Sequence, residues 1–182
     1  MLDTTSTRFS HVKPADTAWR SDGLRDFFLY KDLGVADATH GKVIAHLVKA
    51  NMAPEKGTGW HRHQAEFQIF IMTKGWAKFM YGEQETLVEA GDCVHQRPGI
   101  VHYLYDYSPD MEYLEIVGPA DFTSVDVPAP CNVPAPMPWV CASEMALGWQ
   151  GHGALKTPCP ALRSRQALAW RRLPIRPFRA LP

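Results

Sequence analysis

The chain has 182 residues, of which 46% are hydrophobic and 21% charged, and its 15 prolines and 13 glycines indicate many turns rather than long helices. The formal net charge is zero, but residues 1–144 hold twelve basic and nineteen acidic residues, a net charge of −7, whereas residues 145–182 carry +7. This composition suits one globular domain with tails, and its acidic body argues against a nucleic-acid-binding surface.

Residues 1–40 are polar and mixed, with short apolar pieces such as residues 27–30, so we expect an N-terminal arm or an edge strand that leads into the fold. The sequence shows no basic segment followed by an apolar stretch, as a secretion leader would have, and no run long enough for a membrane-spanning helix. The four cysteines form no CxxC pair that would indicate a zinc knuckle, and Cys93, in an apolar run, is predicted to be a reduced core residue. We therefore expect a cytoplasmic protein.

Residues 41–119 form a dense series of short runs typical of β-strands, such as KVIAHLVKA, EFQIFIMT and VHYLYDY. Turn residues separate many of these runs, for example at Gly75, Gly91-Asp92 and Pro98-Gly99. Short strands at this spacing predict an all-β sandwich or barrel.

Two segments of different composition follow the predicted barrel. Residues 120–140 are proline-rich and extended, and we expect them to lie along the barrel or to reach a neighbouring molecule. Residues 141–182 are basic and rich in Ala, Leu, Arg and Pro. Residues 161–173 are compatible with a short amphipathic helix that contacts an anionic surface or a partner, but we prefer a poorly ordered tail.

Three histidines indicate a metal site. Residues i and i+2 of a strand point to the same face, so His61 and His63 present two imidazoles together. His102 follows two turns, at a place where an antiparallel barrel can return to the same wall. Three neutral imidazoles suit Fe, Zn, Ni, Cu or Mn and leave open positions for water or substrate.

At these residues the sequence resembles the cupin superfamily. The first cupin motif, G-x5-HxH-x3,4-E-x6-G, is similar to HRHQAEFQIFIMTKG from His61 to Gly75, and the second, G-x5-P-x-G-x2-H, is similar to GDCVHQRPGIVH from Gly91 to His102. The resemblance covers roughly residues 41–119. It implies a small antiparallel jelly-roll β-barrel, one divalent metal ion held by His61, His63 and His102, and a homodimer.

The sequence departs from these motifs at two positions. Gln68 occupies the register of the usual glutamate ligand, where it can coordinate through oxygen or hydrogen-bond a metal-bound water. Glu66, two residues earlier, is the alternative ligand, although the register favours Gln68. Losing the carboxylate makes the site one unit more positive, which favours an anionic substrate. Arg97 replaces the proline of the second motif and is interpreted as a solvated loop residue, since Pro98 beside it keeps the turn.

Strand alternation assigns further residues to the predicted substrate pocket, which are Phe70, Met72, Phe79, Tyr81 and Gln96. Glu66 and His46 are the candidates for a catalytic acid or base, and no other group of this kind accompanies the motifs. A partly exposed strand histidine is an equally good interpretation of His46.

The function that we favour from the sequence is an iron-dependent dioxygenase acting on a small, anionic organic substrate, because three histidines leave a face open for a chelating substrate and oxygen. Manganese, nickel, zinc or copper fit the same ligands. The alternatives are a non-catalytic cupin module that binds a metal or small ligand, and a Lewis-acid lyase or isomerase. The scarcity of general bases counts against an isomerase. We expect no nucleic-acid partner and no membrane span.

Overall fold

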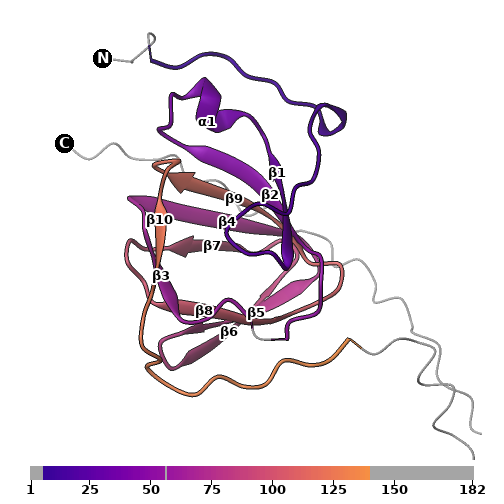
Figure 1. Cartoon of the computed structure of the whole chain (residues 1–182), viewed down its shortest axis with the longest axis vertical. Coiled ribbons are helices and arrows are strands. Elements are labelled where there is room, and N and C mark those ends of the chain that lie inside the picture. The colour runs from indigo at the N-terminus through magenta and orange to yellow at the C-terminus, as the bar shows by residue number, and fades with distance from the viewer. Residues whose placement is uncertain (1–5, 56, 140–182) are drawn as a thin grey trace, which may run out of the picture. The chain divides into compact units, whose positions relative to one another are not determined.

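The computed structural model describes residues 6–55 and 57–139, which form a β-protein with very little helix (Figure 1). The helical elements are a 3-10 turn, η1 (Pro14–Asp16), and a single turn of helix, α1 (Val35–Ala38). The predicted basic tail, residues 141–182, lies outside the described residues. The strands are β1 (Phe28–Asp32), β2 (Ile44–Ala50), β3 (His61–Gln64), β4 (Phe67–Lys74), β5 (Trp76–Tyr81), β6 (Gln84–Glu89), β7 (Cys93–Gln96), β8 (His102–Tyr107), β9 (Glu112–Gly118) and β10 (Thr123–Asp126).

The strands form two five-stranded sheets, in the orders β1-β2-β9-β4-β7 and β10-β3-β8-β5-β6. All of their pairings are antiparallel. From β3 onward the chain repeatedly crosses from one sheet to the other, so that strands adjacent in sequence mostly lie in different sheets. This connectivity confirms the predicted jelly-roll barrel.

The inner faces of the two sheets enclose one main hydrophobic core. Alternation along β9 turns Tyr113, Glu115 and Val117 inward, and each of them is less than 9% exposed. Burying one large apolar side chain contributes roughly 1.5–3 kcal/mol, so this cluster supplies much of the driving force for folding. Its buried members are Phe28, Val48, Phe70, Met72, Ala77, Phe79, Val88, Leu104, Tyr107, Met111 and Tyr113.

The segment predicted as an N-terminal arm contributes the edge strand β1. This strand pairs with β2 from Phe28 opposite Ala50 to Asp32 opposite His46. Before it, Arg20 forms an isolated bridge to Tyr30, so the chain folds back across the edge strand. The backbone N–H of Arg25 donates a hydrogen bond to Tyr30 Oη at 3.1 Å, which fixes the start of β1 beside the barrel interior.

The proline-rich residues 127–139, here called the strap, cover the outer face of the second sheet. Val127, Cys131 and Val133 pack against a second cluster made by Trp60, Met80 and Tyr105. At the end of the strap, Trp139 Nε1 donates to the Tyr107 carbonyl at 3.0 Å and the Met137 amide donates to Asp106 Oδ1 at 3.3 Å. Of the two predicted courses, these residues therefore follow their own barrel.

One sequence-based prediction about the core is wrong. Cys93 is exposed, because alternation along β7 turns Val94 and Gln96 toward the interior and Cys93 outward. The described helices include none that is long and apolar enough to cross a membrane.

Candidate metal site

The three motif histidines lie together in the second sheet, where β3 meets β8. His61 and His63 project from the same face of β3, and His61 is paired directly with His102 on β8. The ring centroids are 4.2 Å apart for His61 and His102 and 5.0 Å apart for the other two pairs. One nitrogen of each ring lies within 4.8 Å of one nitrogen of each of the others, so the three rings could hold one metal ion.

The second nitrogen of each ring is already held by an oxygen acceptor. His61 Nδ1 lies 2.8 Å from the Gly59 carbonyl, and His102 Nδ1 lies 3.0 Å from the Ile100 carbonyl. His63 Nδ1 lies 2.7 Å from Oε1 of Gln68. A carbonyl oxygen accepts a hydrogen bond only from a protonated nitrogen, so all three rings carry their proton on Nδ1. Their Nε2 lone pairs are left for a metal, and the donor set fits a divalent transition ion.

Burial keeps two of these rings neutral. His61 and His102 are 4% and 3% exposed, and loss of hydration lowers the pKa of His61 to about 4 and that of His102 to about 3. The neighbouring ring also contributes in each case, and the charge of Arg25 adds to the lowering of the His61 pKa. Near neutral pH both imidazoles are therefore in the form that binds a metal.

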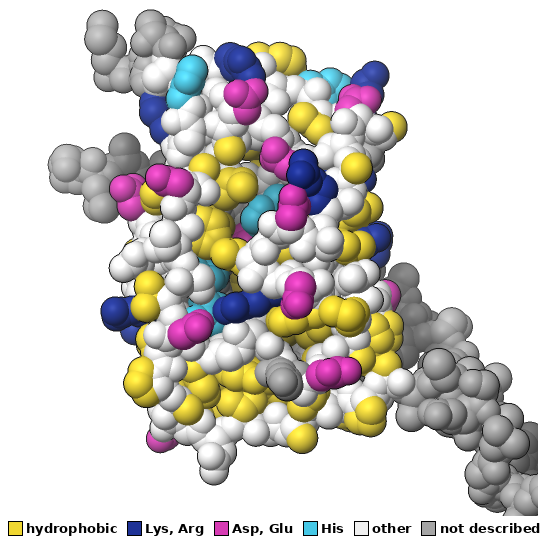
Figure 2. All heavy atoms as spheres, in the orientation of Figure 1, with side chains coloured by type: hydrophobic (Ala, Val, Ile, Leu, Met, Phe, Trp, Pro, Cys, Tyr) yellow, Lys and Arg dark blue, Asp and Glu magenta, His cyan; other side chains and the backbone are white. Residues whose placement is uncertain are grey.

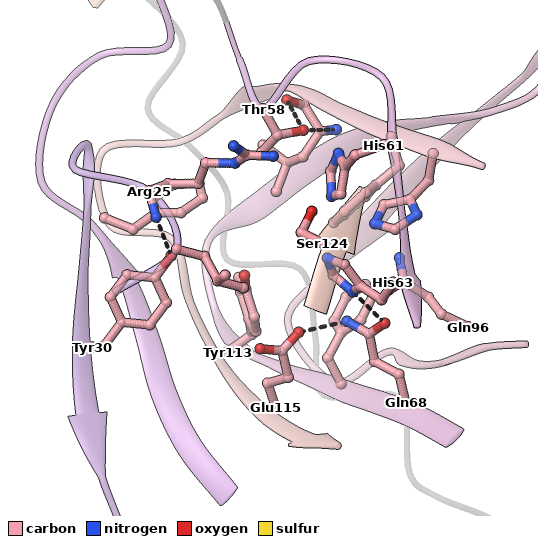
Figure 3. A pocket seen from close by; sticks show the side chains of 16 residues that line it. Arg25, Tyr30, Thr58, His61, His63, Gln68, Gln96, Tyr113, Glu115 and Ser124 are labelled. Carbon is pink, nitrogen blue, oxygen red and sulfur yellow. Dashed lines mark hydrogen bonds between the residues drawn. The ribbon is translucent and has the colours of Figure 1, made fainter. Parts of the chain in front are cut away.

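Gln68 supports His63 from behind. Its oxygen accepts the hydrogen bond from His63 Nδ1, and its nitrogen donates to Oε1 of Glu115 at 2.7 Å (Figure 3). In this arrangement Gln68 orients the metal ligand His63. Its amide oxygen is occupied by the His63 Nδ1 hydrogen bond and is not directed at the three Nε2 atoms. Coordination by Gln68, as the motif register suggests, stays a prediction.

Glu115 is the main site residue that the sequence analysis missed. It is 6% exposed, and its Oε2 lies 2.6 Å from His46 Nε2. Burial by itself raises the pKa of Glu115, but the hydrogen bonds from His46 and Gln68 outweigh this effect and hold the pKa below its ordinary value. Glu115 is therefore ionised, and it supplies the negative charge that a glutamate at position 68 would have given the site. The available signal was that Glu115, one of the two glutamates in the largely apolar run MEYLEIV, alternates in phase with Tyr113 and Val117.

A narrow cavity in the barrel opens beside the histidines, and the volume in it that the centre of a water molecule can reach is about 50 Å³. A volume of this size has room for a few water molecules or a small polar group next to the histidines. On the face drawn in Figure 2, histidine side chains lie in recesses bordered by hydrophobic and charged groups. Its lining includes His61, His63, His102, Gln68, Glu115, Phe70, Phe79, Gln96, Leu104, Arg25, Tyr30, Tyr113 and Ser124.

Of the five predicted pocket residues, Phe70, Phe79 and Gln96 line this cavity. Met72 shares their face but lies further along β4, where it is 1% exposed in the apolar core. Tyr81 lies behind the lining: it accepts a hydrogen bond from Gln96 Nε2 at 2.8 Å and stacks on Phe79. Alternation therefore gave the face of each residue but not its depth in the barrel.

The two predicted acid–base candidates lie outside the cavity lining. Glu66 is exposed and borders a separate surface groove, which reaches the outer side of His63. His46 is 8% exposed and acts on the cavity through its contact with Glu115. Arg97 is exposed, as the sequence interpretation has it.

Residues 48–117 match the sequence profile of the cupin domain. The fold is similar to the polyketide cyclase RemF from Streptomyces resistomycificus, with a TM-score of 0.55 and 12% identity over 68% of this chain and 90% of that one. An RmlC-like cupin protein from Ralstonia eutropha JMP134 gives a TM-score of 0.49 and 18% identity over 63% and 71% of the two chains. No curated protein matches the sequence significantly. At 12% identity the RemF structure shows the fold alone, and the match of residues 48–117 to the cupin domain supports the resemblance to the cupin superfamily that the two motifs indicate.

Proposed function

We propose that this cupin is a metal-dependent enzyme that acts on a small organic anion, and that its reaction is an iron-dependent dioxygenation. The observation that carries the proposal is the set of three imidazoles, which have Nδ1 bound to oxygen acceptors and Nε2 left for a metal beside a cavity. A bound Fe(II) would supply redox chemistry with oxygen, which a redox-inactive ion such as Zn(II) does not.

The residues of the chain prepare this cavity for a ligand. Phe70, Phe79 and Leu104 form an apolar wall, which excludes water and strengthens polar contacts inside. The phenol of Tyr30 stays protonated, because burial and the charge of Glu115 raise its pKa. Its oxygen accepts the Arg25 N–H, so its own hydrogen remains to be donated to a ligand.

Glu115 supports a second candidate, a Lewis-acid lyase or isomerase. The sequence offered no clear general base, and this reduced the case for proton-transfer chemistry. In the structure an ionised carboxylate lines the cavity, with the protonated phenols of Tyr30 and Tyr113 nearby in the lining. A carboxylate and a phenol in one cavity can accept and donate protons during such a reaction.

Metal-specific turnover distinguishes the candidates. Anaerobically prepared protein is loaded with Fe(II) or Zn(II) and mixed with a panel of chelating anions: a deprotonated diketone, a catechol and a hydroxy acid. We expect oxygen consumption with one of them for the Fe(II) form, above the rate of free Fe(II), and binding without oxygen consumption for the Zn(II) form. Tight binding without turnover would support a non-catalytic binding module. Equal, oxygen-independent turnover by both forms would support the lyase or isomerase.

We also propose a homodimer, as the family resemblance implies. The strap covers its own barrel, so the argument that it reaches a second subunit no longer applies. Light scattering after gel filtration would give twice the chain mass for a dimer, and the single chain mass would contradict this proposal.

A further inference from the structure

Arg25 places an unpaired positive charge in the lining of the cavity. The residue is half-buried, and its side chain extends toward His61 in Figure 3. Its backbone is held at both ends, because its N–H donates to Tyr30 Oη at 3.1 Å and its carbonyl accepts from the Phe28 N–H at 3.3 Å. Within the part of the chain that the structure describes, its guanidinium makes no hydrogen bond and no ion pair.

The carboxylate that lines the same cavity is already committed to other donors. Glu115 accepts one hydrogen bond on each oxygen, from His46 on Oε2 and from Gln68 on Oε1. Arginine is always charged in proteins, and a partly buried charge without a partner is costly. The positive charge of Arg25 is therefore left for a ligand.

A second donor in the cavity also lacks a partner. The hydroxyl of Ser124 is buried and makes no hydrogen bond to any described residue, although it lies in the lining. Ser124 is on β10 directly opposite His63 on β3, so strand register fixes it beside the histidines. Buried hydroxyl groups are normally satisfied, and an orphaned one in a cavity indicates a missing acceptor.

We propose that Arg25 binds a second anionic group of the substrate, so that the substrate class is small organic acids with two separate oxyanion groups, one at the three histidines and a carboxylate at Arg25. This inference rests on the proposed function, because the first group is the one that a metal at the histidines would take. The planar guanidinium matches a carboxylate with two parallel hydrogen bonds, and Ser124 supplies a further donor. Tyr30 holds the backbone of Arg25 at the edge of the cavity and so fixes where the second group binds.

Dicarboxylates and their monomethyl esters test this proposal, because each pair differs by one charge. Zn(II)-loaded full-length protein is titrated by calorimetry with malonate, succinate and glutarate and with the three esters. One diacid should bind about tenfold or more tightly than its ester, the gain expected for one charge-assisted contact. In R25Q this preference should fall below about twofold with the zinc content unchanged, and R25K should keep part of it.

Arg20 provides the matched control. It lies in the same segment, is exposed and forms an ion pair with Asp22 at 2.8 Å, so R20Q removes the same charge from outside the cavity lining. R20Q should keep the diacid preference. Thermal unfolding of each variant confirms that it is folded, and the comparison of diacid with ester in the wild-type protein needs no variant.

The possible failures are distinguishable. Equal affinity for diacids and esters in the wild-type protein overturns the Arg25 proposal, as does a preference that survives in R25Q or disappears in R20Q. Zinc content reports separately on the proposed function: if the wild-type protein takes up no zinc, the metal site fails. The same titration of metal-free protein then tests the Arg25 proposal. The preference for a diacid over its monomethyl ester must be present in the wild-type protein and lost in R25Q.

Discussion

Gln68 Nε2 donates a hydrogen bond of 2.7 Å to Oε1 of Glu115, and this contact fixes which way round the Gln68 amide is held. With its nitrogen toward the carboxylate, the amide must turn its oxygen to His63, where it accepts the Nδ1 proton at 2.7 Å. Glu115 thereby selects the tautomer of a ring that it does not hydrogen-bond. The Nε2 lone pair of His63 is available to a metal as a result.

Replacing Glu115 with glutamine tests this chain of contacts. A glutamine side chain can donate or accept on either side, so it no longer fixes the Gln68 amide, and it also removes the negative charge. We expect E115Q to lower metal affinity about 10- to 100-fold, the range found when an outer-shell partner of a ligand is lost. Competition with a chromophoric chelator measures it. Glu112 on the same strand is the control: it pairs with Lys74 at 3.0 Å, and E112Q should leave the metal affinity unchanged. Equal effects of E115Q and E112Q would contradict the role of Glu115 in orienting Gln68 and His63.

Gln68→Glu should keep or tighten divalent metal binding. The new carboxylate would lie beside that of Glu115, and repulsion between them favours turning it toward the metal, where an anionic oxygen is the stronger ligand. Glu66→Gln is the control, because Glu66 is exposed and outside the cavity lining. The same competition assay compares them, and the prediction is wrong if E66Q weakens binding more than Q68E strengthens it.

Transition metal should be present in the native protein in near-stoichiometric amount and should be lost in His61→Ala, His63→Ala and His102→Ala. These variants should still fold, since the main core is built from other residues. Elemental analysis of protein purified without a histidine tag gives the metal content, and circular dichroism gives the fold. His95, an exposed histidine on β7, is the matched control. Full metal content in all three variants would show that the site lies elsewhere.

The metal-free protein should lose stability as the pH falls below about 6.5. In the folded state the pKa values of His61 and His102 are lowered to about 4 and about 3, whereas in the unfolded chain both return to about 6.5. The unfolded state therefore binds more protons between these values, and the free energy of unfolding decreases with decreasing pH. At pH 5 the loss amounts to about 2 kcal/mol for each histidine.

Urea unfolding at pH 7 and pH 5, with a chelator present, measures this effect. His102→Gln removes one of the two titrating groups and should show about half of the pH-dependent loss that these two histidines cause. A metal-free protein with the same stability at both pH values would contradict the assignment of two buried neutral rings.

Two truncations separate the strap from the residues that follow it. Ending the chain at residue 140 keeps all contacts described for the strap, and we expect the melting temperature and metal content to stay nearly unchanged. Ending it at residue 126 uncovers Trp60, Met80 and Tyr105 and removes the Trp139 hydrogen bond, so the melting temperature should fall by several degrees. Aggregation of the chain that ends at residue 140 would show that residues 141–182 contribute to the folded protein or to a dimer.

The sequence was sufficient to predict the barrel and the three histidines, because both depend on short-range patterns. The HxH spacing places His61 and His63 on one face of a strand, and the turns before His102 bring it back to the same wall. Glu115 could not be recognised in this way. Its role depends on pairing with His46, 69 residues earlier in the chain, and the sequence around a carboxylate does not reveal so distant a partner.

Arg25 was missed for a related reason. It lies in a polar segment without periodicity, and tertiary contacts bring that segment to the cavity: the bridge between Arg20 and Tyr30 and the hydrogen bond from the Arg25 N–H to Tyr30 Oη. Met72 and Tyr81 show the opposite error. Strand alternation predicts which side chains point inward, but position along the strand decides whether an inward residue meets the cavity or the core behind it.

The three histidines differ in what holds their Nδ1 atoms, and this difference affects how the site can evolve. His61 and His102 are oriented by main-chain carbonyls, of Gly59 and Ile100, which no single side-chain replacement removes. His63 is oriented by a side chain, Gln68. Inherited variation in metal preference or ligand geometry would therefore be concentrated at position 68 and at Glu115 behind it, while the other two ligands stay constant.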